Sequence, residues 1–257
     1  MGHVVGKPKF RVMLAATEAD IRAAQALRYR VFVTELGSDG VLVDHEAKLE
    51  RDQFDAHCDH LMLIDEAAGD RVVGVYRLLR GTQARDIGQF YSEDEYDLTP
   101  LKASGRNLLE LGRSCLDPAY RGGTAMHVLW QALAQYIEDH RIEILFGVAS
   151  FHGTDAQALA APLSLLHHRH LAPEALRTRA RAAHFQRMDL LPPETLDRRA
   201  AMLQVPALIK AYLRLGGFVG EGAFVDHAFN TTDVCLIMDA TKMSPSRKSI
   251  YARGLAG

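Results

Sequence analysis

The chain has 257 residues, of which 48% are hydrophobic and 24% are charged, and its formal net charge is −2. This composition is typical of a soluble globular protein and excludes the large basic surplus of a nucleic-acid-binding protein. No apolar run approaches the roughly 18 residues of a membrane-spanning helix, and the N-terminus lacks the apolar core of a signal peptide, so we expect a cytoplasmic protein.

Charge is distributed unevenly along the chain. Residues 44–70 hold nine acidic residues against two basic ones, whereas residues 163–200 hold seven arginines against four acidic residues. Residues 240–257 form a basic C-terminal tail. This distribution fits a cationic ligand and an anionic partner, or alternatively only the solvated faces of helices and loops.

Cysteine and histidine give no metal or disulfide pattern. The three cysteines are widely separated, which favours buried reduced thiols over a disulfide framework. Three neighbouring histidines lack a second cluster at ligand spacing, so we expect no metal site. These residues are Cys58, Cys115, Cys235, His167, His168 and His170.

The first third of the chain reads as a strand, a helix and a hairpin. Residues 9–15 (KFRVMLA) predict a strand, and Thr17 begins a capping-box pattern for a helix that reaches about residue 35. An acidic loop follows, and two strands at 60–66 and 71–79 flank a turn.

The middle of the chain alternates strand and helix. After an irregular stretch at 91–98, residues 107–116 predict a strand that ends in a proline and glycine turn. An apolar stripe predicts a helix from Thr124, and residues 142–150 are typical of a buried strand.

The last third contains an arginine-rich segment. Residues 152–205 read as a helical insertion without clear strands, punctuated by prolines. A helix at 206–215 ends at a glycine pair, and two strands follow at 218–229 and 232–240. This order predicts a single mixed α/β domain over residues 1–257.

The segment around Glu110 carries the chemistry. Glu110 alternates with leucines in an otherwise apolar strand, so desolvation could raise its pKa into the range of a general base. The alternative is a salt bridge to Arg113 or another buried arginine. The following turn and helix start, residues 119–128, present backbone N–H groups of the kind that bind phosphate.

These features resemble the GNAT acyltransferase superfamily. The resemblance rests on the hairpin, the strand leading into Arg121-Gly122-Gly123, and the "YLRLGGF" segment at 212–218. It implies a mixed, largely antiparallel sheet flanked by helices, with the strand–turn–helix segment binding the acyl donor. It further implies that Tyr212 protonates the departing thiolate. Because Thr124 and Met126 replace the small residues usual for coenzyme A, the turn suits phosphopantetheine carried on a protein.

A closer resemblance is to the ornithine-lipid acyltransferases. It covers nearly the whole chain, and its most specific parts are "LELGRSCLDPAYRGG" (109–123) and "YLRLGGFVGEGAFVDHAFNTTDVCLIMD" (212–239). It implies transfer of a 3-hydroxyacyl chain from acyl carrier protein to the α-amino group of ornithine, forming lyso-ornithine lipid. The implied partners are acyl carrier protein and ornithine, with peripheral contact at the inner membrane surface, and no nucleic acid is expected. No bound cofactor is expected either, because the phosphopantetheine of the carrier protein serves as the acyl donor group.

The resemblance assigns a role to each residue of the expected site. Glu110 is the expected base, and Tyr212 is the expected acid. Backbone N–H groups at a strand bulge would stabilise the oxyanion. Glu50, Asp52 and Asp55 would bind the δ-ammonium of ornithine, and Arg77 or Arg113 its carboxylate, unless the acids only pair internally with Arg28 and Arg77. The substrate-binding residues are Arg28, Phe32, Glu50, Asp52, Asp55, Arg77 and Arg113. The donor-binding residues are Leu111, Gly112, Arg113, Arg121, Gly122, Gly123 and Thr124.

Other functions stay open. The chain is also similar to acyl-homoserine-lactone synthases at Arg28, Phe32 and the Glu110 to Arg113 spacing, although the tryptophan usual in their first loop is missing. It could therefore acylate a different amine, or act as a non-catalytic acyl-binding protein. The arginines at 169, 177, 179 and 181 are docking candidates for an acidic carrier protein, or else only solvent-facing.

Overall fold

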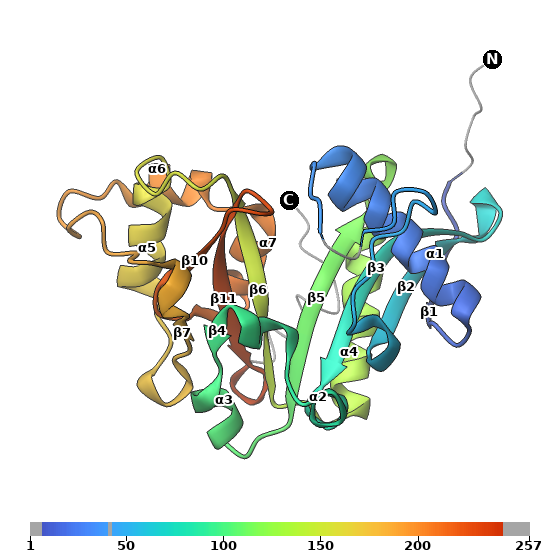
Figure 1. The fold of residues 1–257 in the computed structure, drawn as a ribbon, viewed down its shortest axis with the longest axis horizontal. Helices are drawn as coiled ribbons and strands as arrows, with labels where there is room; N and C mark the ends of the chain where they lie inside the picture. Colours follow the sequence, from blue (N-terminus) through green and yellow to red (C-terminus); the bar gives the residue numbers. More distant parts are fainter. Residues whose placement is uncertain (1–6, 41–42, 244–257) are drawn as a thin grey trace. The chain divides into compact units, whose positions relative to one another are not determined.

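The computed structural model describes residues 7–40 and 43–243, which fall into two compact units (Figure 1). The first unit comprises the described part of Met1–Leu79 together with Leu111–Arg141. The second comprises Arg80–Glu110 and the described part of Ile142–Ser244. The single acyltransferase domain over the whole chain stays a prediction, and most of the basic tail lies outside the described residues.

Four neighbouring strands form the sheet of the first unit, in the order β1-β2-β3-β5. Strands β1 and β2 are antiparallel, and β2 forms an antiparallel hairpin with β3, interrupted by a register shift between Leu63 and Ile64. The predicted strands are confirmed. Their bounds are Phe10–Leu14 for β1, Asp59–Asp65 for β2, Arg71–Arg80 for β3 and Leu108–Leu116 for β5, whose first three residues belong to the second unit.

Helix α1 (Glu18–Arg28) begins with the predicted capping box. The Thr17 hydroxyl accepts a hydrogen bond from the Asp20 backbone N–H, and the Asp20 carboxylate accepts one from the Thr17 N–H. The helix continues into the π-helical segment η1 (Tyr29–Glu35). The predicted helix over 17–35 is therefore confirmed, with a wider second half.

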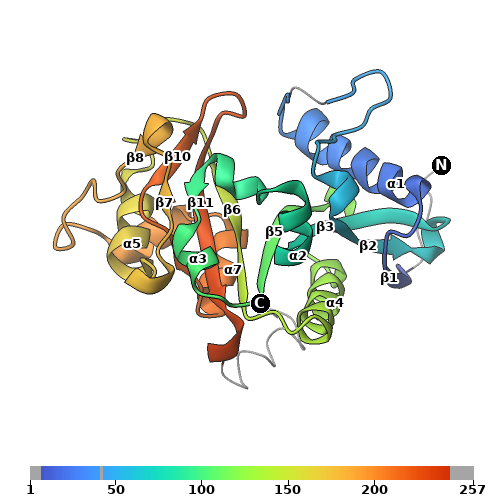
Figure 2. The ribbon, with the colours of Figure 1, turned by 60° about the horizontal axis from the view of Figure 1, so that its bottom comes forward.

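Helices α1 and α4 (Ala125–Asp139) cover opposite faces of the first unit's sheet (Figures 1 and 2). On the α1 face, Leu27 packs with Met62 and Val75. On the α4 face, the Leu116 side chain packs so closely against the backbone of Gly74 that a Cβ on Gly74 would lie 2.6 Å from it. This alternation of inward side chains between two helices explains the apolar β2 and β3 sequences.

The second unit contains the rest of the sheet. Strand β5 pairs in parallel with β6 at only three positions, Leu108 to Glu110, whereas β6–β11, β11–β10 and β10–β8 are antiparallel. The mixed, largely antiparallel sheet is confirmed. The bounds are Ile144–His152 for β6, Phe185–Gln186 for β8, Phe218–Val219 for β9, Ala223–Asp226 for β10 and Thr231–Asp239 for β11.

The arginine-rich insertion differs from its prediction. It contains two helices, but also strand β8 and strand β7 (Arg179–Ala180), which pairs with β4 (Tyr96–Asp97). The segment is helical as expected, but the expectation that it lacks clear strands is wrong, because these two-residue strands form only through distant partners. The helices of this unit are α2 (Gly81–Ile87), α3 (Thr99–Ala103), α5 (Ala160–His170), α6 (Arg198–Gln204) and α7 (Ala207–Arg214).

Helix α7 ends at the predicted glycine pair. Gly216 has φ of 96°, in the left-handed region that favours glycine. The next residue, Gly217, donates its N–H to the Tyr212 carbonyl at 2.9 Å, and a Cβ at Gly217 would lie 2.8 Å from that oxygen. The sequence after Tyr212 therefore requires glycine for a tight turn.

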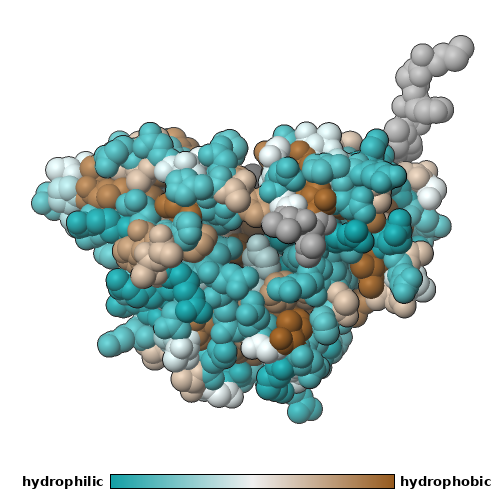
Figure 3. Space-filling view, viewed as in Figure 1, coloured by the Kyte–Doolittle hydropathy of each residue, from teal (hydrophilic) through white to brown (hydrophobic). Residues whose placement is uncertain are grey.

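The face seen in Figure 3 is mostly hydrophilic, with separate apolar side chains. Among the described residues, the large hydrophobic side chains that stand exposed are Leu14, Leu36 and Leu203. None of the helices in the described part of the chain has both the length and the apolar character needed to cross a membrane.

Candidate active site

Glu110 lies on β5 and is only 3% exposed. Its carboxylate accepts hydrogen bonds from the Tyr91 backbone N–H at 2.8 Å and the Ser92 backbone N–H at 2.6 Å. The Ser92 hydroxyl also donates to the same carboxylate. Three donors on a buried carboxylate stabilise its ionised form and fix its orientation.

A closed ring of alternating charges lies in the first unit. Each arginine of this charge ring contacts two carboxylates, and each carboxylate contacts two arginines, so three positive and three negative charges balance. In order around the ring, its members are Arg28, Glu50, Arg113, Asp52, Arg77 and Asp55.

Arg28 is the most deeply buried member of the charge ring. It is fully buried and binds Asp55 through both terminal nitrogens, at 2.7 and 3.1 Å, while its Nε donates to Glu50. Arg77 is 3% exposed and donates to Asp52 at 2.6 Å and Asp55 at 2.9 Å. The paired, bidentate geometry offsets the cost of desolvating these charges.

The arginines of the charge ring lower the pKa of two of its carboxylates, Asp55 and Asp52. Burial opposes ionisation of Asp55, but the guanidinium groups of Arg28 and Arg77 outweigh it and lower the pKa of Asp55 well below its ordinary value. Burial likewise opposes ionisation of Asp52, and Arg77 with Arg113 lowers the Asp52 pKa overall. These two carboxylates therefore stay ionised at neutral pH.

Arg113 joins the ring through an unusual backbone. Its φ is 49°, a left-handed conformation that costs a non-glycine residue roughly 1–2 kcal/mol. Its Nε lies 3.0 Å from Glu50 and its Nη2 lies 3.2 Å from Asp52. The left-handed residue follows Gly112 inside β5, and this local irregularity agrees with the expected bulge of that strand.

The other expected substrate-binding residue, Phe32, has a packing contact. It lies on η1 and packs against the buried cluster that includes Ala24 and Leu27. Leu111 is 8% exposed, and a Cβ on Gly112 would be 3.9 Å from the Arg77 Nε.

The expected donor-binding turn lies between β5 and α4. Arg121 forms a bidentate pair with Glu35, at 2.6 and 2.8 Å, and also donates to the Leu116 carbonyl. Gly122 has φ of 76°, and Thr124 is the residue that precedes α4. The glycine is therefore needed for the turn itself, and Arg121 is already held by an acid.

Tyr212 is 6% exposed and lies on α7. Both Tyr212 and Glu110 belong to the second unit. Its carbonyl closes the helix end described above. The catalytic role of its hydroxyl stays a prediction.

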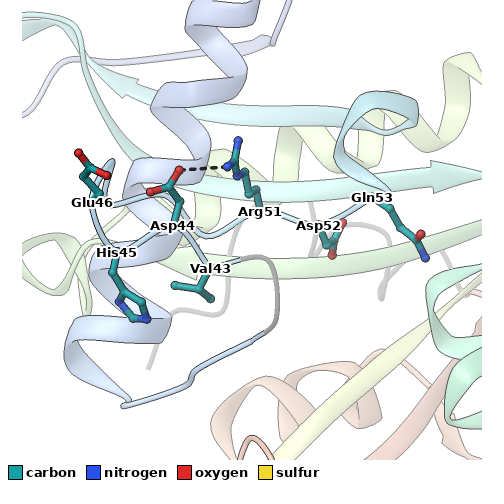
Figure 4. Close-up of a pocket in the computed structure, with 7 residues that line it drawn as sticks. All are labelled: Val43, Asp44, His45, Glu46, Arg51, Asp52 and Gln53. Atoms are coloured by element: carbon teal, nitrogen blue, oxygen red, sulfur yellow. Dashed lines mark hydrogen bonds and ion pairs between the residues drawn. The ribbon is translucent and has the colours of Figure 1, made fainter.

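A pocket of about 570 Å³ opens beside the charge ring (Figure 4). It is an open depression in the surface and not an enclosed cavity. Asp52 belongs to both the pocket and the charge ring, and Asp44 pairs with Arg51 at 3.0 Å across the pocket wall. The lining residues are Val43, Asp44, His45, Glu46, Arg51, Asp52 and Gln53.

Sequence reasoning missed Tyr91, Ser92 and Gln25. Gln25 donates to Asp55 at 2.9 Å from one turn before Arg28 on α1. Its spacing of three residues from Arg28 is a usable helical signal. Ser92 lies in a stretch without periodicity, 18 residues before its partner, so no local pattern identifies it.

The chain is similar to known acyltransferases in its sequence. Residues 27–131 match the family described as Acetyltransferase (GNAT) domain. The chain is 62% identical over 252 residues to the L-ornithine N(alpha)-acyltransferase of Rhodobacter capsulatus, covering 96% of each chain. It is 43% identical over 246 residues to the enzyme of the same name from Brucella abortus, covering 93% of this chain and 88% of that one.

Solved structures share the fold at low identity. The coenzyme-A-dependent acyl-homoserine lactone synthase BjaI has a TM-score of 0.52 and 15% identity, over 95% of this chain and 87% of that one. FeeM, an N-acyl amino acid synthase from uncultured soil microbes, has a TM-score of 0.51 and 10% identity, over 95% of this chain and 99% of that one. These two structures support the GNAT-type fold.

Proposed function

Because the chain belongs to the L-ornithine N(alpha)-acyltransferase family, we propose that it acylates the α-amino group of ornithine. The observation that carries this proposal is the 62% identity to a relative of that name along almost the whole of both chains. We propose a 3-hydroxyacyl chain on acyl carrier protein as the donor and lyso-ornithine lipid as the product.

The reaction needs an uncharged amine, a polarised thioester carbonyl and a protonated leaving thiolate. Glu110, directly or through a water, takes a proton from the ornithine α-ammonium, and the free amine attacks the thioester carbon. Backbone N–H groups of Leu111 to Arg113 stabilise the resulting oxyanion, typically by about 3–4 kcal/mol per donor. As the tetrahedral intermediate collapses, the C–S bond breaks and Tyr212 protonates the departing thiolate. The second proton that the nitrogen loses passes through water to the Tyr212 oxygen, and Glu110 releases the first proton to solvent.

The geometry around Glu110 and Arg113 supports these roles. Glu110 is buried, and three donors hold its carboxylate in one orientation, as is needed for a group that must meet an incoming amine. The left-handed φ of Arg113 reorients the peptide groups beside it, which is what an oxyanion-binding bulge requires.

The pocket supports a site for the diaminoacid. Ornithine carries two ammonium groups and one carboxylate, so its site needs acids beside an arginine. All three ring acids pair with two arginines, but Glu50 and Asp55 are only 7% and 4% exposed, whereas Asp52 also lines the pocket. We therefore assign the δ-ammonium contact to Asp52, with Arg113 beside it for the carboxylate.

Charge supports a carrier-protein donor. Acyl carrier protein is acidic, and Arg169 is exposed on α5. The other three arginines of the docking set have partners within their own unit: Arg177 donates to the Ala172 carbonyl, Arg179 pairs with Glu221, and Arg181 donates to the Glu93 carbonyl. Arg169 is therefore the docking arginine we select.

The phosphopantetheine of the donor and the amphiphilic product each suggest a binding surface. Phosphopantetheine would use the Arg121 to Thr124 turn, where Arg121 exchanges Glu35 for phosphate. The product is amphiphilic, so we also propose peripheral contact with the inner membrane surface from the cytoplasmic side.

A transfer assay read by mass spectrometry tests the function. Purified protein and 3-hydroxyacyl carrier protein are incubated in parallel with ornithine, lysine, glutamine and S-adenosylmethionine. We expect N-acyl-ornithine as the product, with a loss of at least about 100-fold in kcat for Glu110→Gln. Asp239→Asn is the matched control, because Asp239 is equally buried in the same unit but pairs with Arg106.

Other outcomes would change the proposal. Product with S-adenosylmethionine alone would replace the ornithine assignment, and no product with any acceptor, while carrier protein still binds, would leave an acyl-binding protein. For the docking site, Arg169→Glu should weaken carrier-protein affinity in a salt-dependent manner, whereas Arg22→Glu on the exposed face of α1 should not.

A further inference from the structure

The turn η4 (Tyr91–Asp94) is the element that holds Glu110. Both oxygens of the carboxylate are engaged: Oε1 accepts the Ser92 N–H at 2.6 Å and the Ser92 hydroxyl, and Oε2 accepts the Tyr91 N–H at 2.8 Å. A carboxylate offers about four acceptor positions, so this turn alone uses three of them.

Ser92 makes two of these three hydrogen bonds. It is fully buried, and it is the residue of the turn that supplies both a backbone and a side-chain donor to Glu110. Because two donors from one residue converge on Oε1, rotation of the carboxylate about its last side-chain bond would break both bonds together.

The turn is itself braced on two sides. The Glu93 carboxylate accepts hydrogen bonds from the Phe90 N–H at 2.8 Å and from Lys102 at 2.7 Å. Arg181 of the insertion donates its Nε to the Glu93 carbonyl at 2.9 Å and its backbone N–H to the Glu95 carbonyl at 2.8 Å. The insertion therefore supports the turn that supports Glu110.

We propose that Ser92 is a positioning residue for Glu110, fixing the direction of the carboxylate and favouring its ionised form. This inference rests on the proposed role of Glu110 as the base. Ser92 does not touch substrate; it acts through the carboxylate. The insertion acts one step further away, by holding the turn through Arg181.

The test is the pH–rate profile of Ser92→Ala. The variant keeps the two backbone donors and loses the hydroxyl, so we expect kcat to fall by about 10- to 100-fold, less than in Glu110→Gln. Losing a donor to the ionised carboxylate disfavours that form, so the acid limb of the profile should move to higher pH by about one unit. The KM for ornithine should change by less than about twofold.

Two further variants separate positioning from stability. Ser92→Cys keeps a weaker donor in nearly the same volume, and its kcat and acid limb should lie between those of wild type and Ser92→Ala. Ser164→Ala is the matched control: Ser164 is also fully buried in the second unit, and its hydroxyl bonds the backbone of Met188, Leu190 and Leu191. It should lower thermal stability without moving the acid limb.

The outcomes are distinguishable. If Glu110→Gln is inactive but Ser92→Ala keeps the wild-type kcat and acid limb, Ser92 does not position the base and the inference is overturned. If Glu110→Gln keeps full activity, the proposed base itself is wrong and the inference falls with it.

Discussion

Replacing Asp55 with asparagine removes one negative charge from the charge ring and leaves two arginines facing it. Asp55 accepts both terminal nitrogens of Arg28 and one of Arg77, and these arginines are 0% and 3% exposed. Removing one partner of a buried ion pair typically costs about 3–5 kcal/mol, because the remaining charge stays desolvated. We expect Asp55→Asn to lose that amount of unfolding free energy.

Urea unfolding at pH 7, followed by circular dichroism, measures this loss directly. In thermal unfolding, a chain of this size shifts by roughly 2–4 °C per kcal/mol, so Tm should fall by about 6–20 °C. The matched control is Asp189→Asn, which breaks a pair with Arg187 whose side chains are 41% and 66% exposed. That substitution should cost no more than about 1 kcal/mol.

The pH dependence gives a second readout of the same perturbation. Burial opposes ionisation of Asp55, but Arg28 and Arg77 lower its pKa in the folded protein below the unfolded value. Its contribution to stability is therefore complete above about pH 4 and is lost as the pH falls toward the folded pKa. The wild-type advantage over Asp55→Asn should shrink below about pH 4. A loss at pH 7 no larger than that of Asp189→Asn would refute a buried, closed charge ring.

Three further predictions concern other parts of the fold. Gly217→Ala places a Cβ 2.8 Å from the Tyr212 carbonyl oxygen, so we expect thermal unfolding to show a loss of about 1–3 kcal/mol in the free energy of unfolding. Gly81→Ala should be near neutral, because its Cβ would meet nothing closer than 3.8 Å. Equal Tm values for the two variants would contradict the tight turn. Burial raises the pKa of Asp233 to about 6, so wild-type stability should fall as the pH rises from about 4 to 6, and Asp233→Asn should flatten that slope in urea unfolding. Burial also raises the pKa of Cys115 and of Cys235 to about 12, so iodoacetamide at pH 8 should label only Cys58 in the folded protein, and mass spectrometry showing early modification of either buried cysteine would contradict their burial.

The sheet and its two long helices could be predicted from the sequence because their signals are local. The apolar run of β6 and the stripe of α4 each extend over many residues, so periodicity alone identifies them. Strands β7 and β8 have two residues each and exist through their pairing with β4 and β10. A two-residue strand has no period to detect, which is why the insertion reads as helical.

The same distinction applies to the candidate site. The sequence brings Glu50, Asp52 and Asp55 together by spacing, and it offers the internal ion-pair network as one alternative, which the structure contains. The sequence cannot show that Arg113 completes the ring through its contact with Glu50. At that point of β5 the backbone of Arg113 is left-handed, which a strand pattern does not predict. Nor can the sequence show that Ser92 holds Glu110, since the turn and strand meet only in the folded chain.

The boundary between the two units falls at the peptide bond between Glu110 and Leu111. The proposed base and the first proposed oxyanion donor are thus covalent neighbours, with Cα atoms about 3.8 Å apart. Bond geometry fixes the distance between these two Cα atoms. A chain cut at this bond would have to restore by association a proximity that the intact polypeptide holds permanently.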